Sequence, residues 1–418
     1  MRVLAVSNTP FLPATAGNRR RIDAMLSFFV DRGVEVGMLM LPTADIDTWD
    51  VDGMRARLSL LEIATPPALR PVDALHAAWN HASTRIGRAL RRLRHASAAS
   101  APPPWGVDAW CPPWFRARTA AVVEQWDADV VLAEYVFLSS CLTHVRPRPR
   151  RPRPTVIDAH DVMHRRLDAY ASAGLHPTWF HTTAAEERRG LARADLTLAI
   201  HEDDAETLRR LVPERTVLVV PHGHVVRPLA PEDAAPSRLL YVASFNDLNV
   251  QALAWFLREV WPRVRTAIPA ATLTICGNIA EKLGPLPAAV TARGVLASLQ
   301  DEYARARLVI DPARAATGLQ IKLVEALCHG RPVVATPAAA TGIASGPDEG
   351  VVIATSAASF ADAIAQLLGD DTLWRRAAAA AVTQALRRFS PEAAFDPLLR
   401  HLARVTEHCA PPVRSSTV

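Results

Sequence analysis

Short apolar runs alternate along this chain with longer stretches of helical periodicity. The first run, Val3 to Val6, precedes a loop that contains Gly17. A helical stretch from Arg20 to Val30 and a second apolar run from Val34 to Leu41 follow it. Further runs that predict strands lie at 129–132, 155–158, 196–200 and 217–220. Strands that alternate with helices are typical of parallel sheets with right-handed crossovers, so the first half predicts an α/β domain.

A proline-rich, loop-like segment from 221 to 236 separates this pattern from a second one. The new series predicts strands near 239–242, 272–276, 308–310, 332–335 and 351–353, and helices at 357–368 and 372–389. Ser390 followed by Pro391 is typical of a helix start and predicts a final helix that reaches about Val405.

The order of these elements predicts two domains of similar size. The chain has 418 residues, of which 50% are hydrophobic and 21% charged, as in folded globular proteins. We expect an N-terminal Rossmann-like domain over 1–220, a linker over 221–236 and a C-terminal Rossmann-like domain over 237–388. A helix and tail over 389–418 complete the chain, and we expect that helix to pack back on the N-terminal domain.

The composition also bears on where the protein works. No apolar run reaches the roughly 18 residues that a membrane-spanning helix needs. The start of the chain reads as a strand rather than as a signal peptide. The five cysteines are scattered and show no His/Cys spacing typical of a zinc site. We therefore expect a cytoplasmic protein, and a peripheral position at the inner face of the membrane stays open.

The most informative segment follows the strand expected to end at Asp311. A loop through Thr317 and Gly318 leads into a helix expected from Leu319 to His329, which Gly330 ends. Because glycine lets the backbone approach a ligand, the free amides of the first turn should point into the crevice at the carboxyl edge of the sheet. A helix amino terminus in that position is an anion site.

Leu319, Gln320 and Ile321 supply these amides. Lys322 lies one turn in and can reach an oxygen of the same phosphate group. Glu325 lies one turn further on the same helical face, where it can accept hydrogen bonds from ribose hydroxyls. A phosphate at the start of the helix, followed by a sugar diol one turn further along it, is the arrangement that a nucleoside diphosphate presents. The alternative is an ordinary surface ion pair between Lys322 and Glu325.

This segment and its surroundings resemble the retaining GT-B glycosyltransferases of family 4, of the bacterial polysaccharide type. The stretches that carry the resemblance occur in the family's order, at 195–204, 217–223, 239–256, 271–277 and 311–336, with Gly342 behind the donor. The resemblance covers nearly all of 195–345 and, more loosely, the first 45 residues. It implies a GT-B fold, with two Rossmann-like domains facing each other across a cleft. It also implies a nucleoside-diphosphate sugar as donor substrate, without a cofactor.

Two places depart from the family pattern. The family usually carries two glutamates eight residues apart; Glu325 matches the second, but Thr317 stands at the first. Many relatives carry an arginine and a lysine in the loop after the first strand of the second domain, where this chain has Asn246, Asp247 and Asn249. With these departures, the expected donor contacts come from Gly17, Ser244, Gly277, Thr317, Gly318, Leu319, Gln320, Ile321, Lys322 and Glu325.

The acceptor is expected on the N-terminal domain. Gly17 and Asn18 lie in the loop after the first strand, at the carboxyl edge of that sheet, and the alternative for them is a plain turn. The resemblance implies that this loop faces the donor phosphates or the acceptor. Glu134, at the end of another strand, is a further acceptor-side candidate.

His160 and Asp161 follow the strand that ends near Asp158, so they should face the same cleft. The resemblance places a histidine or an acid near the reacting sugar at this point, whereas on its own the cluster reads as a solvated strand end. We expect catalysis to depend on His160, Asp161 and Lys322.

Retaining transfer needs no protein nucleophile if the leaving diphosphate takes the acceptor proton on the same face of the sugar. The protein then stabilises charge on the phosphate and positions the reactants. No metal is expected, because no acidic pair with metal-binding spacing stands at the donor phosphates. The acceptor is a glycan, a lipid-linked saccharide or a secondary metabolite.

Other functions stay open. A nucleotide-sugar epimerase of the same fold would need more acidic and histidine residues on both cleft walls. A catalytically silent scaffold that binds a glycan or a partner is favoured by Thr317. An NAD-dependent enzyme is disfavoured, because neither opening strand is followed by Gly-x-Gly-x-x-Gly.

The arginines gather in two segments, 85–94 and 146–153. They are consistent with docking on anionic lipid, which would give a peripheral membrane contact, but a solvated helix face and a stiff proline-rich loop are slightly favoured. Nucleic acid is not expected as a partner, because no recognised binding module accompanies the charge.

Overall fold

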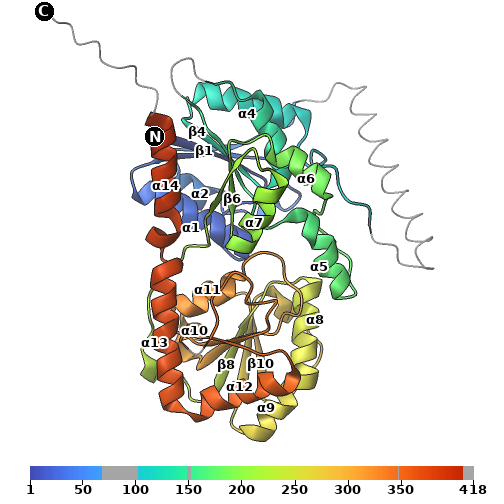
Figure 1. Ribbon diagram of the computed structural model, residues 1–418, viewed down its shortest axis with the longest axis vertical. Coiled ribbons are helices and arrows are strands. Elements are labelled where there is room, and N and C mark those ends of the chain that lie inside the picture. Colours follow the sequence, from blue (N-terminus) through green and yellow to red (C-terminus); the bar gives the residue numbers. More distant parts are fainter. Residues whose placement is uncertain (68–101, 148–151, 347, 408–418) are drawn as a thin grey trace, which may run out of the picture.

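The computed structural model describes residues 1–67, 102–147, 152–346 and 348–407. They form two α/β domains, stacked along the long axis of the molecule (Figure 1). Each domain is built on one parallel sheet. The arginine-rich segment 85–94 and the centre of the segment 146–153, both predicted as membrane-contact candidates, lie outside the described residues.

The N-terminal sheet has the order β3-β2-β1-β4-β5-β6-β7. Its strands are β1 (Arg2–Ser7), β2 (Glu35–Met40), β3 (Leu60–Ile63), β4 (Val130–Glu134), β5 (Thr155–Asp158), β6 (Leu196–Ala199) and β7 (Thr216–Val219). The order changes direction between β1 and β4, which are hydrogen-bonded neighbours. A crevice forms outside the carboxyl ends of the strands at such a point, and ligands bind there in open α/β sheets.

Helices cover both faces of this sheet. They are α1 (Gly17–Asp31), α2 (Val51–Arg57), α4 (Pro113–Gln125), α5 (Arg166–Ser172), α6 (Ala184–Leu191) and α7 (Glu202–Leu211), with short 3₁₀ turns η1 (Ile46–Thr48), η2 (Val136–His144) and η3 (Met163–Arg165). Alternate residues of β1 belong to different cores: Leu4 and Val6 to one, Val3 and Ala5 to the other. Burial on both faces explains why the strands read as continuous apolar runs.

The C-terminal sheet repeats this plan with the order β10-β9-β8-β11-β12-β13. Its strands are β8 (Arg238–Val242), β9 (Thr272–Cys276), β10 (Val290–Gly294), β11 (Leu308–Asp311), β12 (Val333–Ala335) and β13 (Val351–Ile353). Its helices are α8 (Asp247–Trp255), the π-helical turn η5 (Phe256–Val260), α9 (Trp261–Ala267), α10 (Gln300–Arg305), α11 (Ile321–Cys328), α12 (Ala357–Gly369) and α13 (Asp371–Arg388), with short turns η4 (Pro231–Asp233) and η6 (Asn278–Lys282). Here the order changes direction between β8 and β11, so the loops after these two strands border the crevice.

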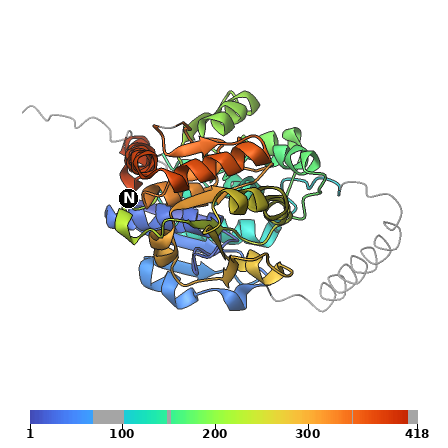
Figure 2. The same cartoon turned by 90° about the horizontal axis from the view of Figure 1, so that it is seen from below.

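The last helix, α14 (Pro391–Glu407), returns to the N-terminal domain. Figures 1 and 2 show α13 and α14 along one side of the molecule, where α14 continues from the C-terminal domain toward α1. Phe395 is fully buried, and its ring lies 5.5 Å from that of Phe28 on α1. Arg32 donates to Asp396 at 2.8 Å. Together with the linker after β7, α14 gives the chain two crossings between the domains.

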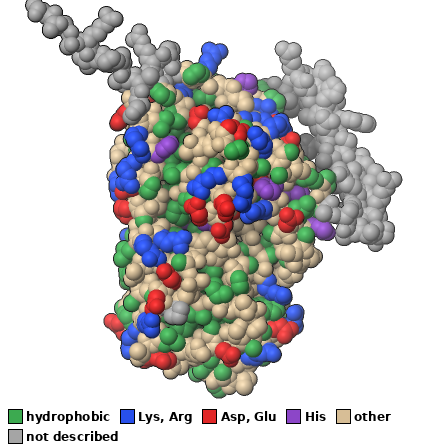
Figure 3. Space-filling model, in the orientation of Figure 1, with side chains coloured by type: hydrophobic (Ala, Val, Ile, Leu, Met, Phe, Trp, Pro, Cys, Tyr) green, Lys and Arg blue, Asp and Glu red, His purple; other side chains and the backbone are tan. Residues whose placement is uncertain are grey.

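On the surface, basic and acidic side chains are intermixed over the face drawn in Figure 3. None of the helices in the described ranges is both long and apolar enough to cross a membrane.

The docking of α14 predicts that Phe395→Ala destabilises the N-terminal domain. Loss of a buried phenylalanine leaves a cavity and costs about 3–5 kcal/mol. Urea unfolding followed by tryptophan fluorescence measures the loss. Leu386→Ala on α13 is the control, because Leu386 is 56% exposed and its truncation should change the free energy of unfolding by less than about 0.5 kcal/mol. Equal effects of the two changes would contradict this packing.

Candidate functional site

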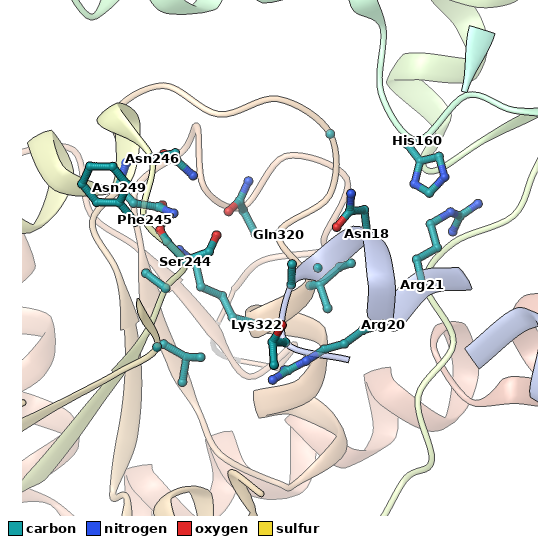
Figure 4. A pocket seen from close by; sticks show the side chains of 18 of the residues that line it. Asn18, Arg20, Arg21, His160, Ser244, Phe245, Asn246, Asn249, Gln320 and Lys322 are labelled. Carbon is teal, nitrogen blue, oxygen red and sulfur yellow. Dashed lines mark hydrogen bonds between the residues drawn. The ribbon is translucent and has the colours of Figure 1, made fainter. Parts of the chain in front are cut away.

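A cavity of about 1150 Å³ lies between the two domains. It is bordered by the loops at the carboxyl ends of both sheets, because the two crevices face each other. Residues 12–18 and 160–161 line it from the N-terminal domain, and residues 242–249 and 315–322 from the C-terminal domain. Figure 4 shows Ser244, Asn246 and Asn249 on one side of this space and Asn18 and Arg20 on the other.

The amino end of α11 opens into the cavity. The helix begins at Ile321 with Gln320 as N-cap, two residues later than predicted, so Leu319 lies in the loop. The backbone amides of Leu319, Gln320 and Ile321 donate to no group among the described residues. Such unpaired amides at a helix start favour an anion, so this end of α11 is suited to a phosphate.

Gly318 brings this loop against the other domain. Its φ is +62°, in the left-handed region, and a Cβ there would lie 3.0 Å from the carbonyl oxygen of His160 and 3.1 Å from Cβ of Asp161. Gly17, the first residue of α1, makes a similar approach, because its Cβ would lie 3.3 Å from Cδ1 of Ile321. The amino ends of α1 and α11 therefore meet at the cavity, where a side chain at Gly318 would clash with the other domain and one at Gly17 would require Ile321 to shift.

Lys322 lines the cavity but is not free. Its Nζ lies 3.2 Å from Oδ2 of Asp311 and 4.8 Å from the centre of the Tyr241 ring. Burial raises the pKa of Asp311, and the attraction of Lys322 opposes that rise. The predicted contact of Lys322 with a phosphate would therefore be shared with a buried carboxylate.

Glu325 differs from its prediction. It was expected to face ribose hydroxyls, but its side chain is 3% exposed and does not line the cavity. Both carboxylate oxygens accept short hydrogen bonds from Nη1 of Arg20 on α1, and Oε2 also accepts one from the Tyr303 hydroxyl at 3.1 Å. The physical reason is the proximity of α1, which brings an arginine across the domain boundary. The sequence signal for this partner is the run Arg19-Arg20-Arg21.

His160 lies directly after β5, with a φ of +60°. Its Nε2 is 2.6 Å from Oε2 of Glu134, and its ring stacks on Tyr135 with centroids 3.9 Å apart. Tyr135 also has a positive φ, +69°. Such backbone conformations cost on the order of 1–3 kcal/mol each and concentrate at functional sites.

Glu134 needs a correction, because it was predicted to face the acceptor. It is fully buried at the end of β4, behind the imidazole of His160. Burial raises the pKa of Glu134, and the hydrogen bond with His160 opposes the rise. Glu134 is thus a positioning residue that fixes the orientation of His160.

Arg21 and Asp158 form the floor beneath His160, and sequence reasoning did not assign them to the site. Arg21 donates two hydrogen bonds to the Asp158 carboxylate, at 2.7 and 2.8 Å, and both side chains are fully buried. Nε2 of His160 lies 3.7 Å from Oδ2 of Asp158. Burial alone would raise the pKa of Asp158, but Arg21 and His160 together hold it below its ordinary value.

Asp161 lies beside His160 and also lines the cavity. Its Oδ2 accepts hydrogen bonds from Nε and Nη2 of Arg166, at 3.0 and 2.8 Å. Its Oδ1 is buried and has no hydrogen-bond partner among the described residues. The guanidinium of Arg166 in turn lies 4.6 Å from the ring centre of Trp179. The structure thus brings His160, Asp161 and Lys322 to one cavity, as their prediction as catalytic residues requires.

The other predicted donor and acceptor residues border the same space. Asn18, Ser244, Gly277 and Thr317 all line the cavity, and Ser244 is exposed at its rim. Gly277 has a φ of +105°, and a Cβ there would lie 2.1 Å from the carbonyl oxygen of Ala243. This glycine lets the loops after β8 and β9 come together under the cavity.

Solved structures of other proteins share this architecture. Sucrose-phosphate synthase from Thermosynechococcus elongatus superposes with a TM-score of 0.69 at 14% identity, covering 97% of this chain and 100% of that one. The chain has the GT-B fold. A second GT-B structure, HepE from Anabaena in complex with UDP, gives a TM-score of 0.66 at 14% identity, with the same coverage.

A third match is a variant of TarM from S. aureus, solved with fondaparinux, α-GlcNAc-glycerol and UDP. Its TM-score is 0.65 at 10% identity, over 96% of this chain and 99% of that one. In sequence, residues 236–370 match the family described as Glycosyl transferases group 1. A search of curated proteins finds no match to the chain. The family match thus covers the domain that carries α11.

Near this GT-B cleft, one buried acid has a strongly shifted pKa. Asp204, in the first turn of α7, is 6% exposed, and its Oδ2 lies 3.3 Å from Nε2 of His201. Burial raises its pKa from 3.8 to about 7, and the nearby Asp161 adds to the rise. Between pH 3.8 and about 7, Asp204 keeps its proton in the folded protein but has released it in the unfolded chain. The free energy of unfolding therefore falls as the pH rises through this range.

We expect the melting temperature of the wild type to fall more steeply than that of Asp204→Asn between pH 4 and pH 7. The amide keeps the shape of the carboxyl group but cannot ionise, so the variant lacks this loss. A pH series of thermal unfolding curves for both proteins measures the difference. Parallel profiles would show that Asp204 titrates normally.

Proposed function

We propose that this protein is a retaining glycosyltransferase of family 4 that uses a nucleoside-diphosphate sugar as donor. The observation that carries the proposal is the set of unpaired amides at Leu319, Gln320 and Ile321, which open into the cavity between two Rossmann-like domains. The group 1 family match over residues 236–370 covers these amides, and the UDP complexes of structures with the same fold support a nucleotide donor.

In the proposed complex the diphosphate lies at the amino end of α11. The amides stabilise the charge that develops on the leaving phosphate, and Lys322, in the first turn of α11, adds a positive charge when it turns from Asp311 to the phosphate. Asn246 and Asn249, in the loop after β8, stand where relatives carry basic residues. The backbone amides therefore provide a larger share of the phosphate binding in this chain.

The acceptor enters from the N-terminal side, where His160 and Asp161 line the cavity. The bond between the anomeric carbon and the phosphate oxygen breaks, and the acceptor hydroxyl forms the new bond on the same face. Its proton passes to the leaving phosphate oxygen, so the protein supplies no nucleophile. His160, held by Glu134, positions the reactants, and the free Oδ1 of Asp161 is placed to accept a hydrogen bond from a hydroxyl. The acceptor class stays open among glycans, lipid-linked saccharides and secondary metabolites.

One observation favours a second function, that of a catalytically silent scaffold. Thr317 stands where the family has a glutamate, and the remaining glutamate, Glu325, is bound to Arg20. Incubation of the purified protein with UDP-, GDP- and dTDP-sugars decides between the two. Slow release of the free sugar supports the transferase, whereas donor binding without any turnover, with or without acceptors, supports the scaffold.

We expect Gly318→Ala to weaken donor binding at least tenfold. The added methyl group would meet His160 and Asp161 at 3.0–3.1 Å and push the amides away from the cleft. Gly33→Ala is a matched control, because Gly33 also has a positive φ, +75°, but a Cβ there would meet nothing within 4 Å. Both changes carry a backbone cost of about 1–2 kcal/mol, so Gly33→Ala should lower the melting temperature without changing donor affinity, whereas Gly318→Ala adds the clash at the cleft. Thermal-shift titration with UDP, GDP and dTDP gives both quantities. Equal donor affinity in the two variants would contradict the site.

The proposed mechanism also predicts the configuration of the released sugar. Hydrolysis of an α-linked donor should first give the α-anomer, because water attacks on the face that the phosphate leaves. Proton NMR within the first minutes, before mutarotation, distinguishes the anomers. Initial release of the β-anomer would show inversion and exclude this mechanism.

A further inference from the structure

A buried histidine without partners lies behind the donor site. His222, in the linker after β7, is 1% exposed, and neither Nδ1 nor Nε2 has a hydrogen-bond partner among the described residues. An imidazole has at least one donor and one nitrogen that can accept or bind a metal. Leaving both nitrogens buried and unpaired costs free energy. A metal ion or another bound group that pairs with the imidazole would offset this cost.

Two further metal-binding side chains lie beside it. The ligand atoms of His222, His224 and Glu325 all lie within 4.8 Å of one another. Two imidazoles and one carboxylate form a donor set that zinc uses, with a fourth position left for water. Imidazole nitrogen also selects zinc and its late first-row neighbours over magnesium and calcium, which prefer oxygen ligands.

The backbone that carries the two histidines is fixed. Gly223, between them, packs against α14 so closely that a Cβ would lie 2.5 Å from the Phe395 ring. The amide of His224 donates to the carbonyl oxygen of Phe389 at 2.7 Å. A tetrahedral zinc with bonds of about 2.0–2.1 Å needs ligand atoms about 3.4 Å apart. On this fixed backbone, side-chain rotations that move the ligand atoms by about an ångström therefore suffice to close the site.

Arg20 is already paired with Glu325, the third of these ligands. It donates to both oxygens of Glu325, but its side chain is 26% exposed and lines the cavity, so it can turn toward solvent. Arg21, which also lies near His222, is paired with Asp158, and Arg227 is a further cation near His224. Zinc and the Arg20 guanidinium are thus alternative partners of the same carboxylate.

From this geometry we propose that His222, His224 and Glu325 form a zinc site at the domain junction, which zinc enters by displacing Arg20 from Glu325. The site joins the linker to α11 and is separate from the donor phosphates, where no metal is proposed. The other cluster of this kind among the described residues, Glu134, Asp158 and His160, is already closed by Arg21 and by the bond between His160 and Glu134.

Isothermal titration of the chelator-treated full chain with zinc chloride tests the proposal, with cobalt absorption spectra to report the ligand geometry. We expect one zinc per chain, and a loss of affinity of more than tenfold in His222→Ala, His224→Ala and Glu325→Gln, since even outer contacts of a metal site are worth 10–100-fold. Arg20→Gln should instead bind zinc about tenfold more tightly, because it removes the competing cation. His401→Ala, on α14, should bind like the wild type, and magnesium should not bind.

Absence of zinc binding in the wild type would overturn the proposal, as would binding that survives loss of His222 and His224. Should His222→Ala fail to fold, Glu325→Gln and Arg20→Gln decide, because their opposite effects cannot arise from general destabilisation. Donor binding measured in EDTA runs in parallel, so failure of the zinc site and failure of the proposed transferase function are seen separately.

Discussion

The close approach of the two domains at the cleft depends on a residue without a Cβ at Gly318, since a Cβ there would lie 3.0 Å from the carbonyl oxygen of His160. A left-handed glycine at the end of the loop after β11 lets α11 start against the other domain. Gly17 does the same for α1. The two helix amino ends thereby face one cavity, and the loops that carry the proposed chemistry are held at its walls. This close approach acts together with the Arg20–Glu325 pair, which crosses the same boundary.

The charges of the cavity are balanced in pairs. Each lysine and arginine that lines it has a carboxylate partner: Arg20 with Glu325, Arg21 with Asp158, Arg57 with Asp23, Arg166 with Asp161 and Lys322 with Asp311. A pair of this kind contributes little net charge to a bound diphosphate unless it opens. The unpaired amides of α11 are therefore the attraction that is available without rearrangement. Exchange of partners around Arg20 then links the donor site to the histidines of the linker.

Much of this architecture could be predicted from the sequence. The internal strands β5 and β9 span the predicted residues, because their apolar residues are buried and form continuous apolar runs. The edge strand β13 also spans its predicted residues. The edge strands β3 and β10 were not predicted. Every residue of β3 is half-buried, and β10 alternates half-buried and exposed residues without an apolar run.

The candidate site was predictable in part for a similar reason. Residues at strand ends, such as His160 and Gly318, follow from the order of elements, because the carboxyl ends of parallel strands share one edge. Partners across the domain boundary do not follow from local pattern. Arg20 and Glu325 are 305 positions apart in the chain, and His222 lies in a linker whose packing only the tertiary structure determines.

The proposed transferase activity requires a nucleoside diphosphate at the amino end of α11. A crystal structure of the protein with UDP, or with whichever diphosphate raises its melting temperature most, tests it most directly. We expect phosphate oxygens within about 2.7–3.2 Å of the amide nitrogens of Leu319 and Gln320. A diphosphate bound elsewhere, with these amides covered by protein side chains, would contradict it.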